Sequence, residues 1–189
     1  MKRSNKSINV FYMVLFTMLG VLMFISDIIF ELIPNVHGVA LFICVITLVY
    51  RAKALIPIFI YIMLNAVTSL VISAGYSFWW VPYLYIFPIL WLLVMLIPKK
   101  ASVKAKIALC TVFSGIHGLL FGLMYLPYQI VMYRLNYEMA VAWLVSGLGF
   151  DLIHMVSNIV MCSLLYPLYK SLVRLEASRQ SKFTKKENE

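Results

Sequence analysis

The chain has 189 residues, of which 63% are hydrophobic and only 12% are charged, and its net charge is +9. A soluble domain carries roughly 25% charged residues. Here no Asp, Glu, Lys or Arg occurs within residues 8–26, 32–50, 54–98 or 107–133, whereas a membrane helix needs only about 20 apolar residues. The composition therefore indicates an integral membrane protein and excludes a water-soluble enzyme. Because the basic residues lie in short clusters between the apolar runs, they indicate a membrane partner and not nucleic acid.

The apolar runs predict six membrane-spanning helices, at about residues 8–30, 36–50, 55–73, 82–97, 107–128 and 139–169. The uncharged stretch 54–98 has room for two of them, separated by a turn at 74–81. Helices are expected because backbone amides find no water partner in hydrocarbon. We therefore predict an all-α membrane protein without a soluble domain. Residues 1–169 form its six-helix transmembrane domain, and 170–189 form a basic, polar, solvated tail that is expected to be frayed after Arg174.

The basic residues also predict the orientation. In the six-span arrangement, all but one of the 16 Lys and Arg residues lie on one side, and only Arg134 lies on the other. Cytoplasmic loops of membrane proteins are enriched in Lys and Arg. Both termini are thus expected in the cytoplasm, with the chain crossing the cell membrane several times. The opposite side carries acidic, aromatic and amide groups.

Polar side chains inside the apolar runs are the functional candidates, because ionisable groups at membrane depth are costly. Asp151, His154 and Asn158 are three and four residues apart, which places them on one helix face. The remaining candidates, which would line a cavity open to the outside, are Asp27, Glu31, Asn35, His37, His117, Tyr125 and Gln129. Structural alternatives remain for several of them. Asp151 and His154 can form a pair that fastens two helices, Asp27 and Glu31 can lie in headgroup water, and His37 can be an exposed loop residue.

Aromatic and small residues add two further patterns. Trp79, Trp80 and Tyr83 lie where the fourth span begins, and they form either an interfacial aromatic belt or a stacking wall for a flat ligand. Ser114, Gly118 and Gly122 are spaced at four-residue steps, which favours close helix–helix contact. Whether that contact is internal or with another subunit remains open. The three cysteines have no CxxC spacing and are predicted to be buried packing residues.

Several catalytic motifs are absent from the sequence, including HExxH, GxSxG, the P-loop and GxGxxG. The chain is therefore not predicted to be an enzyme, and it lacks the means to hydrolyse ATP. Uphill transport of a solute would need an ion gradient or a partner ATPase.

Four short stretches carry a family resemblance: residues 34–37 (PNVH), 79–85 (WWVPYLY), 117–122 (HGLLFG) and 150–154 (FDLIH). With the length and the six spans, they resemble the substrate-binding S component of energy-coupling factor (ECF) importers. The resemblance implies capture of a vitamin-like micronutrient, docking on a transmembrane T component and two cytosolic ATPases, and no covalently bound cofactor. ATP would be used by the partner subunits only. In one departure, the docking alanines of the first span are missing, and only Thr17, Gly20 and Ser26 interrupt its bulky residues.

Two ligand classes suit these groups. An aromatic heterocycle with ring nitrogens or a positive charge would find hydrogen-bond acceptors in Asp27, Glu31 and Asp151. A metal tetrapyrrole such as heme is the second, with its metal bound by His37, His117, His154 or Met155 and an acidic substituent paired with Arg134. Two other functions remain open: an intramembrane metal-dependent enzyme built on Asp151, His154 and His117, and an assembly protein whose polar groups only tie helices together.

Overall fold

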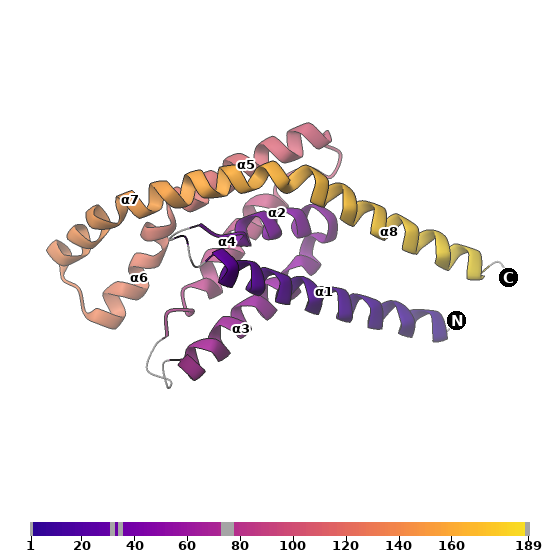
Figure 1. Cartoon of the computed structure of the whole chain (residues 1–189), viewed down its shortest axis with the longest axis horizontal. Helices are drawn as coiled ribbons and strands as arrows, with labels where there is room; N and C mark the ends of the chain where they lie inside the picture. Colours follow the sequence, from indigo (N-terminus) through magenta and orange to yellow (C-terminus); the bar gives the residue numbers. More distant parts are fainter. Residues whose placement is uncertain (1, 31–32, 34–35, 73–77, 188–189) are drawn as a thin grey trace.

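The computed structural model describes residues 2–30, 33, 36–72 and 78–187, and every regular element within them is helical (Figure 1). The elements are α1 (Lys2–Phe30), α2 (Val39–Tyr50), the 3-10 turn η1 (Arg51–Ala54), α3 (Leu55–Ile72), α4 (Tyr83–Met95), α5 (Val103–Leu119), α6 (Phe121–Tyr133), α7 (Tyr137–Met161), the 3-10 turn η2 (Cys162–Leu164) and α8 (Leu165–Glu187). The predicted all-α architecture is confirmed.

Four segments of the described chain are long and apolar enough to cross a membrane: Val10–Phe30, Val39–Ile72, Val103–Tyr133 and Tyr137–Ser181. The second contains both α2 and α3, which are separated by η1, where Arg51 adopts a φ of 55° and the chain turns back. Helix α4 is apolar but shorter than these four. The structure therefore supports a multi-pass membrane protein, while the number of six spans stays a prediction.

Helix α2 forms the centre of the bundle. Of its residues, only Phe42 and Val49 are not fully buried, because α2 packs against α1, α4, α5 and α8. Many large apolar side chains on the surrounding helices are exposed instead. In a soluble protein such a surface would promote aggregation, whereas lipid tails can cover it.

Small residues let the surrounding helices approach one another closely. A Cβ on Gly118 would lie 2.9 Å from the backbone of His154 in α7, and one on Gly20 would lie 2.9 Å from the carbonyl oxygen of Pro57 in α3. The small-residue steps at 114–122 therefore make an internal contact, which answers the question left open by the sequence. Gly20 is likewise used inside the chain, against α3, and is not available for docking.

The predicted cytoplasmic segments meet at one end of the molecule. The guanidinium group of Arg51 donates hydrogen bonds to the carbonyl oxygens of Met95 (2.5 Å) and Ile97 (3.1 Å). The hydroxyl of Tyr12 donates to Glu176 (2.7 Å), and the Lys53 ammonium lies 4.7 Å from the centre of the Tyr12 ring. Figure 1 shows both chain termini at this same end. We call it the basic end, and the clustering agrees with the predicted loop charges.

Two expectations about helix continuity were wrong. The tail after Arg174 was expected to be solvated and irregular, but α8 continues to Glu187 because no Gly or Pro follows Pro167 to end it. The predicted span 107–128 is interrupted at Leu120 and then extends to Tyr133. The 3-10 turn η2 precedes Pro167, whose ring crowds the preceding helical turn.

Candidate ligand cavity

A cavity lies between the helices, and residues from six helices and the segment before α2 line it. The lining residues are His37, Val39, Ala40, Tyr61, Tyr83, Phe87, His117, Phe121, His154 and Asn158. Its empty space, counted with the open mouth, is about 310 Å³, and most of it is too narrow for a water molecule. The cavity is therefore a narrow slot between its walls.

The position of the cavity follows from the directions of α2 and α4. Both helices begin at the cavity and run to the basic end. Helix α2 has 12 residues, so at 1.5 Å per residue it is about 18 Å long. The cavity therefore lies about 18 Å from the basic end, which is more than half the thickness of a hydrocarbon layer of about 30 Å.

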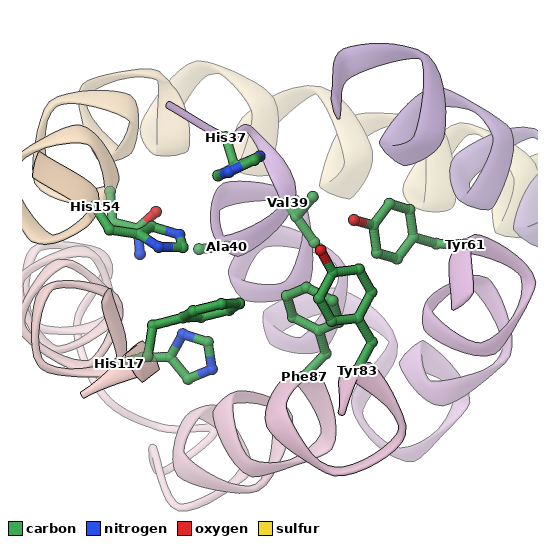
Figure 2. A pocket seen from close by; sticks show the side chains of 10 residues that line it. His37, Val39, Ala40, Tyr61, Tyr83, Phe87, His117 and His154 are labelled. Atoms are coloured by element: carbon green, nitrogen blue, oxygen red, sulfur yellow. The ribbon is translucent and has the colours of Figure 1, made fainter. Parts of the chain in front are cut away.

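The cavity has two unlike walls, which Figure 2 shows on opposite sides of Val39 and Ala40. On one side are His154 and His117, with His37 above them. On the other side the rings of Tyr61, Tyr83 and Phe87 pack together, with centroids 4.7 to 6.3 Å apart. Such a pairing of a flat aromatic wall with a few polar groups is typical of small-molecule sites.

Asp27 connects three segments at the edge of the cavity. Its two carboxylate oxygens lie 2.5 Å from Nδ1 of His37 and 2.7 Å from the Tyr61 hydroxyl, which donates to it. The side chains of Asp27 and His37 are 16% and 33% exposed. Neither residue is therefore a freely solvated group, and the contact holds the end of α1 against α3 and the start of α2.

His117 and His154 lie deeper in the cavity wall. The Nε2–H of His117 donates to the carbonyl oxygen of Ile86 in α4 (3.0 Å), while its Nδ1 is buried without a partner among the described residues. The ring of His154 lies 5.1 Å from that of His37 and 4.6 Å from that of Phe121, centre to centre. His154 makes no hydrogen bond within the described part of the chain, so both of its ring nitrogens remain available to a ligand.

Asn158 completes the polar side of the cavity, one turn of α7 beyond His154. Its Nδ2 donates to the backbone carbonyl of Ser114 in α5 (2.9 Å). Its Oδ1 is buried and has no partner among the residues that the structure describes. A buried amide oxygen without a hydrogen bond costs about 1–3 kcal/mol. After His117, Asn158 is therefore the second lining residue with a buried polar atom that could still bind a ligand.

Asp151 does not line the cavity, although it shares a buried face of α7 with His154 and Asn158 as predicted. Its Oδ1 accepts a hydrogen bond from the backbone N–H of Gly122 (3.0 Å), in the first turn of α6. The N–H groups of a first helical turn lack partners within their own helix and attract an anion. The structural pair that the sequence suggested between Asp151 and His154 does not form, since His154 makes no hydrogen bond within the described residues. Asp151 instead fastens α7 to α6 through Gly122.

The remaining predicted residues lie around the cavity and not on it. The hydroxyl of Tyr125 donates to the carbonyl oxygen of Trp79 (2.7 Å), and the Trp79 ring packs edge-on against Tyr83. Trp80 packs against the core, and Gln129 is half-buried on α6. These contacts build a support behind the aromatic wall. Two predicted residues, Glu31 and Asn35, lie outside the described residues.

Sequence reasoning missed five lining residues: Val39, Ala40, Tyr61, Phe87 and Phe121. Tyr61 carried a usable signal. Together with Asn65 and Ser69 it places a polar group at every fourth position of an apolar run, and all three are buried on one face of α3. Val39, Ala40, Phe87 and Phe121 carried none, because an apolar residue that lines a cavity is indistinguishable in sequence from one that packs in the core.

The width of the cavity and the position of Arg134 bear on the two ligand classes. The cavity is narrow in this structure, with open space for little more than a water molecule between its walls, so a single ring needs a smaller movement of the helices than a tetrapyrrole does. Arg134 is exposed and is not a lining residue. Within the described residues, no group of three or more His, Cys, Asp or Glu side chains is arranged to hold a metal ion, which concerns an ion held by the protein alone and not the metal of a tetrapyrrole.

No protein-family model matches this chain, and the curated proteins and the solved structures contain no match either. The resemblance to S components therefore stays a prediction. The cavity is therefore the main evidence about function.

Proposed function

We propose that the chain is a membrane-embedded subunit that captures a small aromatic heterocycle from outside the cell, in the manner of an ECF S component. The observation that supports this is a cavity between the helices in which buried polar atoms of His117 and Asn158 lack partners among the described residues. Each unmet group costs about 1–3 kcal/mol. The buried hydroxyls of Thr47 and Ser157 also lack partners there but do not line this cavity, so it is the position of the His117 and Asn158 atoms on the cavity wall that supports a ligand.

The proposal includes an orientation. The basic end lies in the cytoplasm, six helices cross the cell membrane, and the cavity opens towards the outside. The positive-inside rule supports this arrangement, because Arg51, Lys53 and Arg179 gather at one end with both chain termini. A solute that enters from the outside would meet the partly exposed side chains of Asp27 and His37 at the edge of the cavity.

Partner subunits are part of the proposal. The sequence holds no motif for ATP hydrolysis, so uptake against a gradient would be driven by two cytosolic ATPases through a T component. The chain itself would bind the solute without changing it chemically. The narrow cavity and its wall of packed aromatic rings favour a small ring system as the solute, and a heme-like ligand would need a larger movement of the helices.

Native mass spectrometry of the full chain after mild extraction tests the proposal. We expect a co-purified small aromatic compound that is lost in Ala40→Phe, which fills the cavity between its two walls. Ala142→Phe places the same ring on an exposed position of α7 and should retain the compound. Retention of the same compound by Ala40→Phe, or no compound in the unmodified protein, would contradict capture in this cavity. Uptake by cells that lack the ATPase partners would contradict the S-component mechanism.

A further inference from the structure

We propose that the cavity selects rings that carry N–H donors, such as amino-substituted nitrogen heterocycles in neutral or cationic form, over rings that carry only acceptors or a carboxylate. This inference rests on the proposed capture function and deepens it. It follows from the hydrogen-bonding roles that the protein's own contacts impose on two groups of the cavity, His117 and Asn158.

The role of His117 follows from its contact with α4. A carbonyl oxygen can only accept, so the Nε2 that lies 3.0 Å from the carbonyl oxygen of Ile86 must carry the hydrogen. In the neutral imidazole, Nδ1 then has a lone pair and no hydrogen. His117 is only 3% exposed and its Nδ1 has no partner among the described residues. His117 therefore presents an acceptor that only a donor can satisfy.

The amide of Asn158 is oriented by the same logic. Its Nδ2 donates to the carbonyl oxygen of Ser114 at 2.9 Å, which leaves Oδ1 as the atom without a partner in the described part of the chain. Rotating the amide by 180° would place two acceptors against each other and would lose this bond. Asn158 is 1% exposed. The second unmet atom on the cavity is thus also an acceptor.

The other polar groups of the cavity do not oppose this preference. Nδ1 of His37 lies 2.5 Å from Oδ1 of Asp27 and carries the hydrogen, while Nε2 of His37 accepts in a neutral ring and donates in a protonated one. The hydroxyl of Tyr61 is not available as a donor to a ligand, because it donates to the other oxygen of Asp27. Tyr83 and His154 make no hydrogen bond within the described chain and can serve either role. The two groups whose roles are determined, His117 and Asn158, are both acceptors.

The charges near the cavity favour the same class of ligand. Asp27 contacts two of the lining residues, and the lining, as far as the described residues form it, contains no Lys or Arg. A ligand carboxylate would be buried there without a cation, which is strongly unfavourable. An amino-substituted or protonated ring would instead lie against aromatic faces and near a carboxylate, where a partial or full positive charge is stabilised.

A series of single-ring probes tests the inference on the purified full chain in lipid nanodiscs. The probes are pyrimidine, 4-aminopyrimidine, 2,4-diaminopyrimidine and pyrimidine-4-carboxylate, and binding is measured by equilibrium dialysis. We expect each amino group to lower the Kd about tenfold, because it satisfies an acceptor that would otherwise stay unpaired. The carboxylate should not bind. Only binding that Ala40→Phe removes is counted as binding in the cavity.

A variant pair links the selectivity to Asn158. Asn158→Leu removes the amide oxygen and should reduce the preference for 4-aminopyrimidine over pyrimidine to less than about threefold. Asn65→Leu is the matched control, because Asn65 is also buried but bonds within α3 and does not line the cavity. It should leave the preference unchanged. The probe series on the unmodified protein remains decisive if Asn158→Leu does not fold.

The outcomes separate this inference from the proposed function. If pyrimidine or the carboxylate binds in the cavity as tightly as the amino compounds, the donor preference is wrong and capture of a ring stands. If no probe binds and native mass spectrometry finds no retained compound, the unmet acceptors serve only water and both proposals fail. Tenfold steps that depend on Asn158 and not on Asn65 would support the inference.

Discussion

Replacing Gly118 by alanine should open the contact between α5 and α7. The added Cβ would lie 2.8 Å from Nδ2 of Asn158 and 2.9 Å from the backbone carbonyl carbon and oxygen of His154. A side chain can rotate away from such a clash, but the backbone of α7 cannot. Because ordinary contact begins at about 3.4 Å, the two helices must separate by about 0.5 Å. Both affected residues line the cavity, so ligand binding should weaken as well.

The magnitude is best measured against a second glycine. Overpacking of this kind typically costs about 1–3 kcal/mol. Gly147 lies in α7, and a Cβ added there would meet no described atom within 4 Å, so Gly147→Ala introduces no clash. Both substitutions gain the same helix propensity, about 1 kcal/mol in aqueous helices. The difference between the two variants therefore isolates the clash, and about 1–3 kcal/mol corresponds to about 2–12 °C in Tm for a chain of this size.

A thiol-reactive fluorescent dye provides the assay. The three cysteines, Cys44, Cys110 and Cys162, are all buried and form no disulfide, so they should react only when the protein unfolds. We expect the fluorescence transition of Gly118→Ala below that of Gly147→Ala by the stated margin. Equal transition temperatures would show that α5 and α7 are not packed through this glycine, and the placement of His154 and Asn158 on the cavity would then be wrong.

Two further predictions concern the ends of the molecule. Arg51→Ala should lower the free energy of unfolding by about 2–3 kcal/mol, because it removes two charged hydrogen bonds to carbonyl groups at the end of α4 and just after it. Arg134→Ala should change it by less than about 0.5 kcal/mol, since Arg134 has a similar positive φ but is exposed; equal losses would contradict the structural role of Arg51. In intact cells, an impermeant maleimide should label Glu138→Cys, and it should label Lys100→Cys only after lysis. The reverse pattern would invert the proposed orientation.

The helical fold was predictable because the physical constraint behind it is strong. Apolar runs in lipid must be helical, and the basic residues between them mark the ends, as at Arg51. The interruption at Leu120 was not predictable, since neither Gly nor Pro stands there, and the hydrogen bond that accompanies it joins Gly122 to Asp151, which is 29 residues away in the sequence. The continuation of α8 to Glu187 was missed because polar composition was taken as a sign of an irregular tail.

The polar half of the candidate site was predictable for a different reason. His37, His117, His154 and Asn158 were identified because polar groups in apolar runs are costly, and all four line the cavity. The same rule selected Asp151, but burial alone does not distinguish a group that faces a cavity from one that caps a helix. The two roles differ only in what each side chain meets. Asp151 meets the first turn of α6, whereas His154, one turn further along α7, meets the cavity.

Asp151 and the interruption at Leu120 together determine how α6 packs against α7 beside the cavity. The interruption frees the N–H of Gly122 in the first turn of α6, and the carboxylate of Asp151 accepts from it. The ring of Phe121, the neighbouring residue, then packs on His154, which lies one turn along α7 from Asp151. One polar contact and one ring contact thus determine how α6 meets α7. A residue outside the cavity therefore positions two of the side chains that line it, and this is why a structural role for Asp151 is compatible with a ligand-binding role for His154.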